Sequence, residues 1–281
     1  MSQFTPPASQ PKIALITGCS SGIGLHCARR LFPRWRVFAT ARRAEDVQKL
    51  QQEGLELLLL DLDNSDSIAA ALSDILQKTD GRIDALFNNG AFGLPAAVED
   101  LSRAALRAQF ETNVFGTQEL TNAVIAVMRK NGGGRIVQNS SVLGFVPLKY
   151  RGAYNASKYA LEGLSDTMRL ELTGDNIHIA LIEPGPITSR FRINAVKQFE
   201  KWIRPEKSAH AETYAKLREQ WNIEKPAAFE LGPEAVYLAL IHAFELPSPK
   251  IRYRVTIPTK VFWWLKRFLP SSWLDKILGK I

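Results

Sequence analysis

Short apolar runs alternate with amphipathic stretches along most of this chain. The first run, residues 12–17, reads K-I-A-L-I-T and is followed by a glycine-rich turn and by a helical pattern over residues 25–32. Short apolar runs bounded by turn residues are typical of buried strands. By the same criterion we expect six further strands, at residues 36–40, 55–60, 83–88, 135–139, 177–183 and 252–257.

Helical patterns fill the intervals between these strands. Asn64 or Ser65, and Ser102, are suited to cap the starts of two helices, and Pro233 is suited to open another that runs through Phe244. Strands that alternate with helices at this spacing predict a parallel sheet with helices on both faces. Because the sequence shows no internal repeat or linker, we expect one doubly wound α/β domain of about seven strands over residues 1–258.

One connection, residues 184–232, is too long for an ordinary loop, so we expect it to contain helices and to cover a site. Its aromatic residues suit a lid over an apolar pocket, and they suit equally a helical insertion that packs for stability. These residues are Phe191, Phe199, Trp202, Trp221 and Phe229.

The composition is that of a globular protein, with 46% hydrophobic and 23% charged residues among 281. No apolar run precedes the prolines at the start of the sequence, and the apolar runs elsewhere are too short to cross a bilayer. We therefore expect a cytoplasmic protein. The two cysteines, Cys19 and Cys27, form no C-x-x-C pair and are expected to be reduced packing residues. The four histidines lack metal-ligand spacing, so no metal is expected.

Positive charge is concentrated at one end of the sequence. The formal net charge is +8, and residues 250–281 contribute +7 of it, from eight basic residues against Asp275. The remaining residues are nearly neutral, which argues against a broad nucleic-acid surface. Residues 259–281 therefore form a specialised segment that is basic, amphipathic and rich in tryptophan.

The turn after the first strand reads G-C-S-S-G-I-G. Its glycines permit a sharp turn and a close approach of the backbone to a pyrophosphate, and a helix that begins within it directs N–H groups at the phosphates. The spacing is G-x-x-x-G-x-G and differs from the G-x-G-x-x-G dinucleotide fingerprint. The cofactor contacts expected from this turn are Gly18, Ser20, Ser21, Gly22, Ile23 and Gly24.

The end of the second strand bears on the choice of cofactor. An NAD-binding protein usually has an acid there to hold the ribose 2′-hydroxyl, and this chain instead reads A-T-A-R-R over residues 39–43. An arginine offers a planar fork to a phosphate, so Arg42, with Arg43 as a second candidate, predicts the 2′-phosphate of NADP(H). The alternative is a solvated basic start to the next helix. Asp61 and Leu62, after the third strand, are placed to contact the adenine.

The sequence Y-N-A-S-K places Tyr154 and Lys158 four residues apart. In a helix these side chains share a face, and a cation within about 4–6 Å lowers the pKa of a tyrosine by roughly 1–3 units. Such a tyrosine is a usable general acid or base. Ser141 is expected to fold back beside it and to hydrogen-bond a carbonyl oxygen that gains negative charge. Taken alone, this spacing is also common on solvated helix faces.

Six motifs in order make the chain similar to a known family. They are T-G-C-S-S-G-I-G (17–24), N-N-G-A (88–91), Asn113, Ser141, Y-N-A-S-K (154–158) and P-G-P-I-T (184–188). Over residues 12–257 the chain resembles a short-chain dehydrogenase/reductase with a Rossmann-type fold. Within that family it is similar to bacterial NADP-dependent aldehyde reductases related to 17β-hydroxysteroid and retinol dehydrogenases.

The resemblance implies a role for each matching catalytic residue. Tyr154 would donate the proton, Lys158 would lower the pKa of Tyr154 and bind the nicotinamide ribose, and Ser141 would hold the substrate oxygen. Asn113 would interrupt its helix and keep a water in a proton relay to Lys158. The family also implies a homo-oligomer, either a dimer or a tetramer.

The resemblance also implies cofactor contacts outside the glycine-rich turn. The family usually reads N-N-A-G where this chain reads N-N-G-A over residues 88–91. This exchange is expected to move the need for a positive φ to Gly90 or to Gly93. The implied contacts, on the adenosine side first and then on the nicotinamide side, are Asn88, Gly90, Pro184, Ile187 and Thr188.

Together these residues predict an enzyme that reduces an apolar aldehyde or ketone to the alcohol, with the hydride supplied by NADPH. One alternative is NADP-dependent oxidation of a steroid or retinoid alcohol, and another is a non-catalytic NADP-sensing module on the same fold. Apolar residues beside Ser141 and Tyr154 indicate an apolar pocket. They are Leu94, Val142, Leu143, Phe145, Val146 and Leu148.

Residues 260–281 hold three of the six tryptophans among five basic residues. Such a segment suits a membrane interface, the wall of an apolar substrate pocket, or packing on the sheet edge or in a dimer interface. We expect weak, salt-sensitive contact with anionic membranes. After Pro270 the pattern places five apolar residues on one helical face, namely Trp273, Leu274, Ile277, Leu278 and Ile281.

Overall fold

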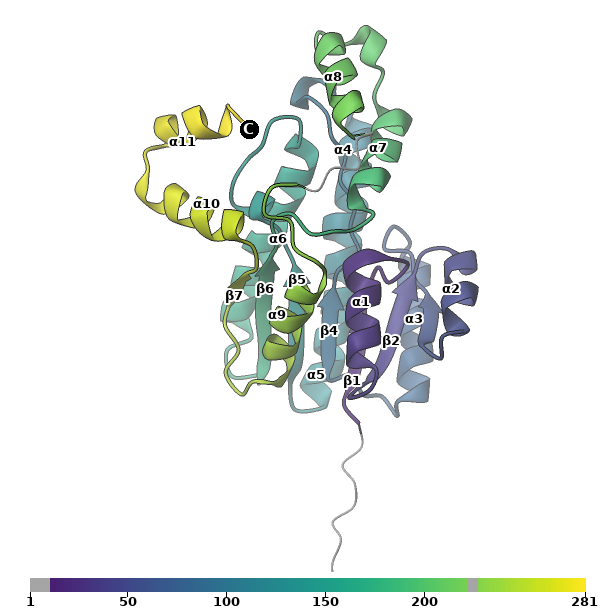
Figure 1. The fold of residues 1–281 in the computed structure, drawn as a ribbon. Helices are drawn as coiled ribbons and strands as arrows, with labels where there is room; N and C mark the ends of the chain where they lie inside the picture. The colour runs from purple at the N-terminus through teal and green to yellow at the C-terminus, as the bar shows by residue number, and fades with distance from the viewer. Residues whose placement is uncertain (1–10, 222–226) are drawn as a thin grey trace, which may run out of the picture.

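In the computed structural model, which describes residues 11–221 and 227–281, a seven-stranded sheet forms the centre of the molecule. Its pairings are parallel, in the order β3-β2-β1-β4-β5-β6-β7, and helices cover both faces (Figure 1). The predicted doubly wound α/β fold is therefore confirmed. Residues 1–10 of the expected domain and residues 222–226 of the expected lid lie outside the described residues. The strands are β1 (Ile13–Ile16), β2 (Arg36–Ala41), β3 (Glu56–Leu59), β4 (Ala85–Asn88), β5 (Gly134–Asn139), β6 (Ile177–Glu183) and β7 (Arg252–Arg254).

The helices alternate with these strands as the sequence predicts. Asn64 caps α3 by accepting a hydrogen bond from the backbone N–H of Ser67, and Ser102 caps α4 by accepting one from Ala105. The helices are α1 (Gly22–Leu31), α2 (Ala44–Gln51), α3 (Ser65–Lys78), α4 (Arg103–Phe110), α5 (Thr117–Lys130), α6 (Gly152–Glu171), α7 (Phe191–Trp202), α8 (Ala211–Trp221), α9 (Glu234–Glu245), α10 (Ile257–Phe268) and α11 (Ser271–Leu278).

The strand order reverses at β1, which pairs with β2 on one side and with β4 on the other. In a parallel sheet such a reversal leaves a crevice between the turns that follow β1 and β4, at the carboxyl edge of the sheet. Ligands bind in this crevice in folds of this kind. The two turns approach each other closely. A Cβ on Gly18 would lie 2.7 Å from the Cα of Gly90, so no larger residue fits there.

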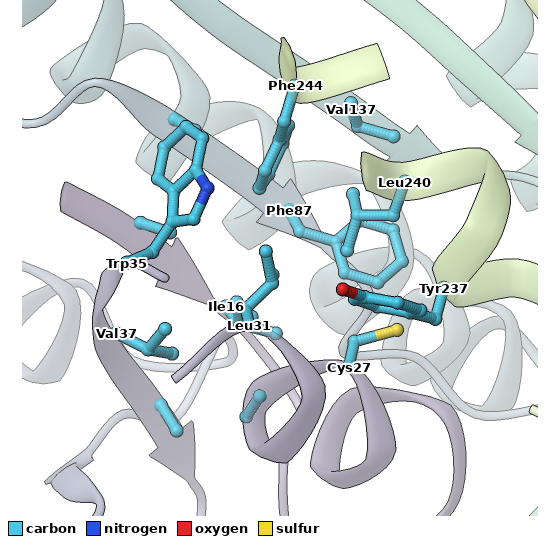
Figure 2. Packing of buried hydrophobic residues seen from close by; sticks show 14 of the residues in the cluster. Ile16, Cys27, Leu31, Trp35, Val37, Phe87, Val137, Tyr237, Leu240 and Phe244 are labelled. Atoms are coloured by element: carbon cyan, nitrogen blue, oxygen red, sulfur yellow. The ribbon is translucent and has the colours of Figure 1, made fainter. Parts of the chain in front are cut away.

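Two apolar layers hold the helices on the sheet. On one face, side chains from α1 and α9 pack against the strands, as Figure 2 shows for Cys27 and Leu31 of α1 beside Tyr237 and Leu240 of α9. On the other face, side chains from α3, α5 and α6 pack against the strands. Cys19 and Cys27 are buried and form no disulfide, as expected of packing residues.

The last strand is shorter than expected. β7 ends at Arg254, and Ile257 already belongs to α10. The side chain of Thr256 accepts a hydrogen bond from the N–H of Thr259, and Pro258, which has no N–H to satisfy, lies in the first helical turn. The alternating pattern of residues 252–257 therefore concealed a helix cap, and α10 crosses the expected boundary at residue 258.

The long connection contains α7 and α8, which confirms the prediction that it has helices of its own. Phe199 and Trp202 pack with Tyr214 in an apolar cluster, so these two aromatic residues stabilise the insertion. Phe191 instead lies against Tyr154, with ring centroids 5.2 Å apart. Phe229 is exposed, and the side chain of Trp221 lies outside the described part of the chain.

The C-terminal segment folds into α10 and α11, which stand at the carboxyl end of the sheet beside β7 (Figure 1). Leu274 and Leu278 are buried against Val146, whereas Trp273 and Ile277 are exposed. The expected apolar face is present, because Trp273, Leu274, Ile277 and Leu278 fall within about 140° of the circumference of α11 at 3.6 residues per turn. Ile281 lies beyond the end of α11, and only the edge of the face that holds Leu274 and Leu278 meets protein. None of the described helices is long and apolar enough to cross a membrane.

Candidate active site

Tyr154 and Lys158 lie one turn apart on the inner face of α6, with exposed fractions of 9% and 3%. The ammonium nitrogen of Lys158 is 5.7 Å from the centroid of the Tyr154 ring. Ser141, which follows β5, has its hydroxyl close enough to the phenol to lower the pKa of Tyr154. The structure therefore brings together the three residues expected to handle the proton.

The pKa of Tyr154 differs from the sequence-based expectation. Burial raises it to about 12, and the Ser141 hydroxyl offsets this only in part. The expected lowering of this pKa is not found, because the phenolate loses its hydration in this site. The phenol consequently keeps its proton at neutral pH.

Lys158 is held by the backbone at the end of β5. Its ammonium donates a hydrogen bond of 2.6 Å to the carbonyl oxygen of Asn139. Burial lowers the pKa of Lys158 to about 8, and the carboxylate of Glu162, one turn along α6, works against that shift. Because this pKa lies above 7, the ammonium form predominates at neutral pH.

Asn113 lies in a π-helical stretch, Glu111–Gly116, between α4 and α5, so the expected interruption of the helix is present. Its side-chain oxygen accepts a hydrogen bond from the N–H of Phe92. Its side-chain nitrogen donates to the carbonyl of Phe92 and to the hydroxyl of Ser157. The π turn thus directs Asn113 toward α6, and such turns are frequent at functional sites.

Two asparagines that sequence reasoning did not assign connect the glycine-rich turn to Lys158. The side-chain nitrogen of Asn89 donates to the carbonyls of Thr17 and Gly18, at 3.0 and 3.2 Å. Its side-chain oxygen accepts a 2.9 Å hydrogen bond from Asn139, whose backbone carbonyl accepts from Lys158. The signal that could have found them is their position, since each stands where one of two adjacent strands ends.

The glycine-rich turn fits a dinucleotide. Gly18 and Gly22 have φ angles of +72° and +59°, and a Cβ on Gly24 would lie 2.4 Å from the carbonyl oxygen of Gly18. The helix α1 begins at Gly22, and the side chain of Ser21 does not cap it. The N–H groups of its first turn, beside Ser20 and Ile23, therefore suit a pyrophosphate.

Arg42 and Arg43 have different environments at the end of β2. Arg43 donates a hydrogen bond of 2.9 Å to Asp46 in α2, so its guanidinium is bound to that helix. Arg42 is exposed and has no hydrogen-bond or ion-pair partner in the described part of the chain. Arg42 is thus the better placed of the two to meet a phosphate.

The adenosine side is built differently from the expectation. Neither Gly90 nor Gly93 has a positive φ, so that prediction is wrong. Their need for glycine is spatial, because a Cβ on Gly90 would lie 3.1 Å from Leu62 and one on Gly93 would lie 2.8 Å from Phe191. Asn88 is buried and donates to the hydroxyl of Thr121 on α5, so it supports the sheet.

Asp61 is half-buried after β3, and its carboxylate accepts a hydrogen bond from the N–H of Asp63.

The segment after β6 is held in place by hydrogen bonds at both of its ends. The carbonyl of Pro184 accepts a hydrogen bond from the N–H of Val142, which places it beside the turn of Ser141.

Further along this segment, Ile187 pairs with Leu231 in a short parallel bridge. The hydroxyl of Thr188 donates to Glu230 at 2.8 Å, so this hydroxyl is already engaged within the protein.

Three of the six apolar residues expected to line a substrate pocket pack elsewhere in the structure. Phe145, Val146 and Leu148 pack against the C-terminal helices. Leu94 is buried in the apolar cluster that it forms with residues of α7 and α8, whereas Val142 and Leu143 are half-buried beside Ser141. The apolar surroundings of the phenol come instead from Phe191 and from the backbone at Gly93, where a Cβ would lie 3.6 Å from the Tyr154 ring.

The chain resembles known proteins in sequence and in fold. A family model described as short chain dehydrogenase matches residues 12–199. The uncharacterized oxidoreductase YbbO of Escherichia coli K12 is 41% identical over 95% of this chain and 94% of its own length. Human 17-beta-hydroxysteroid dehydrogenase type 1 is 33% identical over 92% of this chain and 79% of its own. A closed serine dehydrogenase complexed with NADP+ superposes with a TM-score of 0.74, at 25% identity, over 88% of this chain and 95% of its own.

Proposed function

Because this chain belongs to the short chain dehydrogenase family, we propose that it reduces an apolar aldehyde or ketone to the alcohol with NADPH. Membership makes the protein an oxidoreductase that acts on CH–OH groups with NAD(P), rather than a non-catalytic sensing module. The proposal adds the direction, the class of substrate and the choice of NADP. The observation that carries it is the buried phenol of Tyr154, which has Ser141 and Lys158 beside it and the ring of Phe191 against it.

A protonated Tyr154 suits the proton delivery that reduction needs, and by microscopic reversibility the same residue accepts that proton in the reverse reaction. Reduction of a carbonyl needs a proton at the oxygen, whereas oxidation of an alcohol needs a base to remove one. A phenol whose pKa is raised to about 12 is in the donor form at neutral pH. The ammonium of Lys158 then stabilises the phenolate as it forms, which is when the charge is most needed.

The side chains divide the work on the substrate oxygen. The hydroxyl of Ser141 holds that oxygen by a hydrogen bond, and the phenol of Tyr154 transfers its proton to it. Bound NADPH supplies the hydride to the carbonyl carbon. Lys158, fixed by the carbonyl of Asn139, remains beside the phenolate. Asn113, which the π turn places against Ser157 of α6, supports the return of a proton to that phenolate.

The surroundings of the phenol favour an apolar substrate. The Phe191 ring meets Tyr154 edge to face, and the backbone of Gly93, where a Cβ would lie 2.8 Å from Phe191, borders both rings. The name of the human relative, 17-beta-hydroxysteroid dehydrogenase type 1, supports a second candidate, the oxidation of a steroid alcohol. Both candidates require an apolar pocket and the same side chains, and they differ in the direction of hydride transfer.

NADP is favoured over NAD by the end of β2. The chain has no acid there for a ribose 2′-hydroxyl, and Arg42 is exposed without a partner among the described residues. A guanidinium binds a phosphate through two parallel hydrogen bonds. Gly18, Ser20, Ser21, Gly22, Ile23 and Gly24 would hold the pyrophosphate.

The substrate class is tested by following NADPH oxidation with straight-chain aldehydes of increasing length, a ketosteroid, retinal and glyceraldehyde. We expect kcat/KM to rise with chain length by up to about fourfold per buried methylene, because each removes apolar surface from water. Glyceraldehyde is the polar control. Highest efficiency with glyceraldehyde, or turnover only in the direction of oxidation, would contradict the proposal.

Replacement of Tyr154 by Phe tests the proton donor. Tyr154→Phe is expected to lower kcat by a factor of roughly 10²–10⁴, since it removes general acid catalysis. The affinity for NADPH, measured by fluorescence titration, should change little. Tyr159→Phe on the same helix is the matched control, because the Tyr159 hydroxyl only accepts a hydrogen bond from Lys266 at the surface. A Tyr154→Phe enzyme within tenfold of the wild type would defeat the mechanism.

Arg42→Ala tests the choice of cofactor. Loss of a charge-assisted hydrogen bond costs about 1.5–3 kcal/mol, so the KM for NADPH should rise by about tenfold or more while that for NADH stays nearly constant. Arg43→Ala is the matched control, since Arg43 is bound to Asp46. Equal changes in the KM for both cofactors would show that Arg42 is only part of the scaffold.

A further inference from the structure

The two C-terminal helices each carry an exposed apolar stripe. On α10 it consists of Ile257, Val261, Trp264 and Phe268, which fall within roughly a sixth of the helix circumference at 3.6 residues per turn. A second stripe, Trp273, Ile277 and Ile281, follows α11 to the end of the chain. These seven residues are a third of the 21 large apolar side chains that are exposed in the described residues.

Contacts on the opposite side of α10 fix which way its stripe faces. Phe262 and Leu265 pack against the cluster around Val146. Lys266 donates hydrogen bonds to the carbonyl of Phe145 and to the hydroxyl of Tyr159. Because these residues turn inward, the stripe on α10 necessarily faces away from the sheet.

Trp263 completes this inner side. The centroid of its ring lies 4.1 Å from the guanidinium carbon of Arg254. The ring also lines a cavity of about 390 Å³, together with Glu162 and Glu183. The neighbouring Trp264 lies outside the cavity lining and is 54% exposed. Its ring stacks on that of Phe268, with centroids 5.3 Å apart and planes 11° apart, and Phe268 is 67% exposed. Contiguous exposed apolar surface of this kind marks interaction sites.

Basic residues flank both stripes. Lys260 and Arg267 are exposed beside the stripe of α10, and Lys276 and Lys280 are exposed beside that of α11. Asp275 is the only acidic residue from position 250 onward. In the described part of the chain, none of these four basic side chains has an ion-pair partner. The surface is therefore complementary to one that is apolar and negatively charged.

We propose that α10 and α11 dock the enzyme on an anionic lipid bilayer, with the Trp264, Phe268 and Trp273 rings in the headgroup layer and the lysines toward the lipid phosphates. A second copy of this chain suits the surface less well. A two-fold interface would place the same patch opposite itself, and the uncompensated basic residues would face each other.

Docking on this side would bring the active site to the membrane. The loop that α11 packs against, residues 145–148, connects Ser141 to Tyr154. In Figure 1, α10 and α11 stand at the same end of the sheet as the lid helices α7 and α8. If the substrate is apolar, as proposed above, it would reach the phenol from the lipid phase. The docking itself does not depend on the reaction.

Sedimentation with vesicles tests the docking. Full-length protein is mixed with vesicles of phosphatidylcholine alone or with phosphatidylglycerol added, at low and at high salt. We expect it to sediment with the anionic vesicles at low salt and to be released at high salt, where the Debye length falls to about 3 Å. Trp264→Ala, Phe268→Ala and Trp273→Ala combined should weaken this binding by about tenfold or more.

Matched control variants test whether binding depends on the stripes of α10 and α11 and their flanking lysines, rather than on the number of exposed apolar side chains or on the net charge. Phe32→Ala, Leu170→Ala and Leu238→Ala combined also remove three exposed apolar side chains, from other parts of the surface, and should bind like the wild type. Lys260→Gln, Lys276→Gln and Lys280→Gln combined should lose binding to anionic vesicles. Lys49→Gln, Lys130→Gln and Lys207→Gln change the net charge equally and should retain it. Melting temperature and NADPH titration verify that each variant is folded.

Three results would overturn the docking. One is the absence of sedimentation with anionic vesicles, and another is equal binding by the patch variants and their matched controls. The third is a fall in molar mass, by light scattering, of the aromatic variant relative to the wild type, with vesicle binding unchanged. That result would assign the patch to a second copy of the chain. All three are independent of turnover, so they are distinct from a failure of the proposed reaction.

Discussion

The contact between the turns that follow β1 and β4 is the constraint on which the rest of the site depends. Gly18 lies against Gly90 so closely that a Cβ would not fit, and Asn89 bonds the carbonyls of Thr17 and Gly18. The same asparagine accepts a hydrogen bond from Asn139, which in turn holds Lys158 through its carbonyl. The place where the pyrophosphate would bind and the place where the proton moves are therefore positioned by one set of hydrogen bonds across the edge of three adjacent strands.

Burial determines the chemistry that this frame can perform. It raises the pKa of Tyr154 and lowers that of Lys158, so both shifts favour the neutral form, yet the phenol stays protonated and the ammonium stays charged at pH 7. Glu162 helps to keep Lys158 charged, and it is itself bound by Arg252 of β7. Tyr154, the proton donor, and Lys158, the cation that stabilises the phenolate left after proton transfer, are thus both present before any substrate arrives.

The sequence predicted what depends on local pattern and missed what depends on tertiary contact. The alternation of apolar runs and helices predicted the parallel sheet, and Asn64 and Ser102 were recognisable as caps. The direction of the Tyr154 pKa shift could not be read from a spacing of four residues, because that spacing contains no information on burial. The link from Asn89 to Asn139 joins two strands that are fifty residues apart. Likewise, the apolar face of α11 is broad, and only its packing on residues 145–148 shows which edge of that face is buried.

In the reaction proposed for this site, hydride passes from NADPH to the carbonyl carbon of an apolar substrate while Tyr154 supplies the proton. The most direct test is to reduce a long-chain aldehyde with NADPH deuterated at C4 of the nicotinamide, on one face and then on the other, and to locate the label by mass spectrometry and NMR. We expect one deuterium at the carbinol carbon of the alcohol, with one of the two labelled cofactors only. Alcohol formed without deuterium from either cofactor, or no alcohol at all, would contradict the proposed reaction.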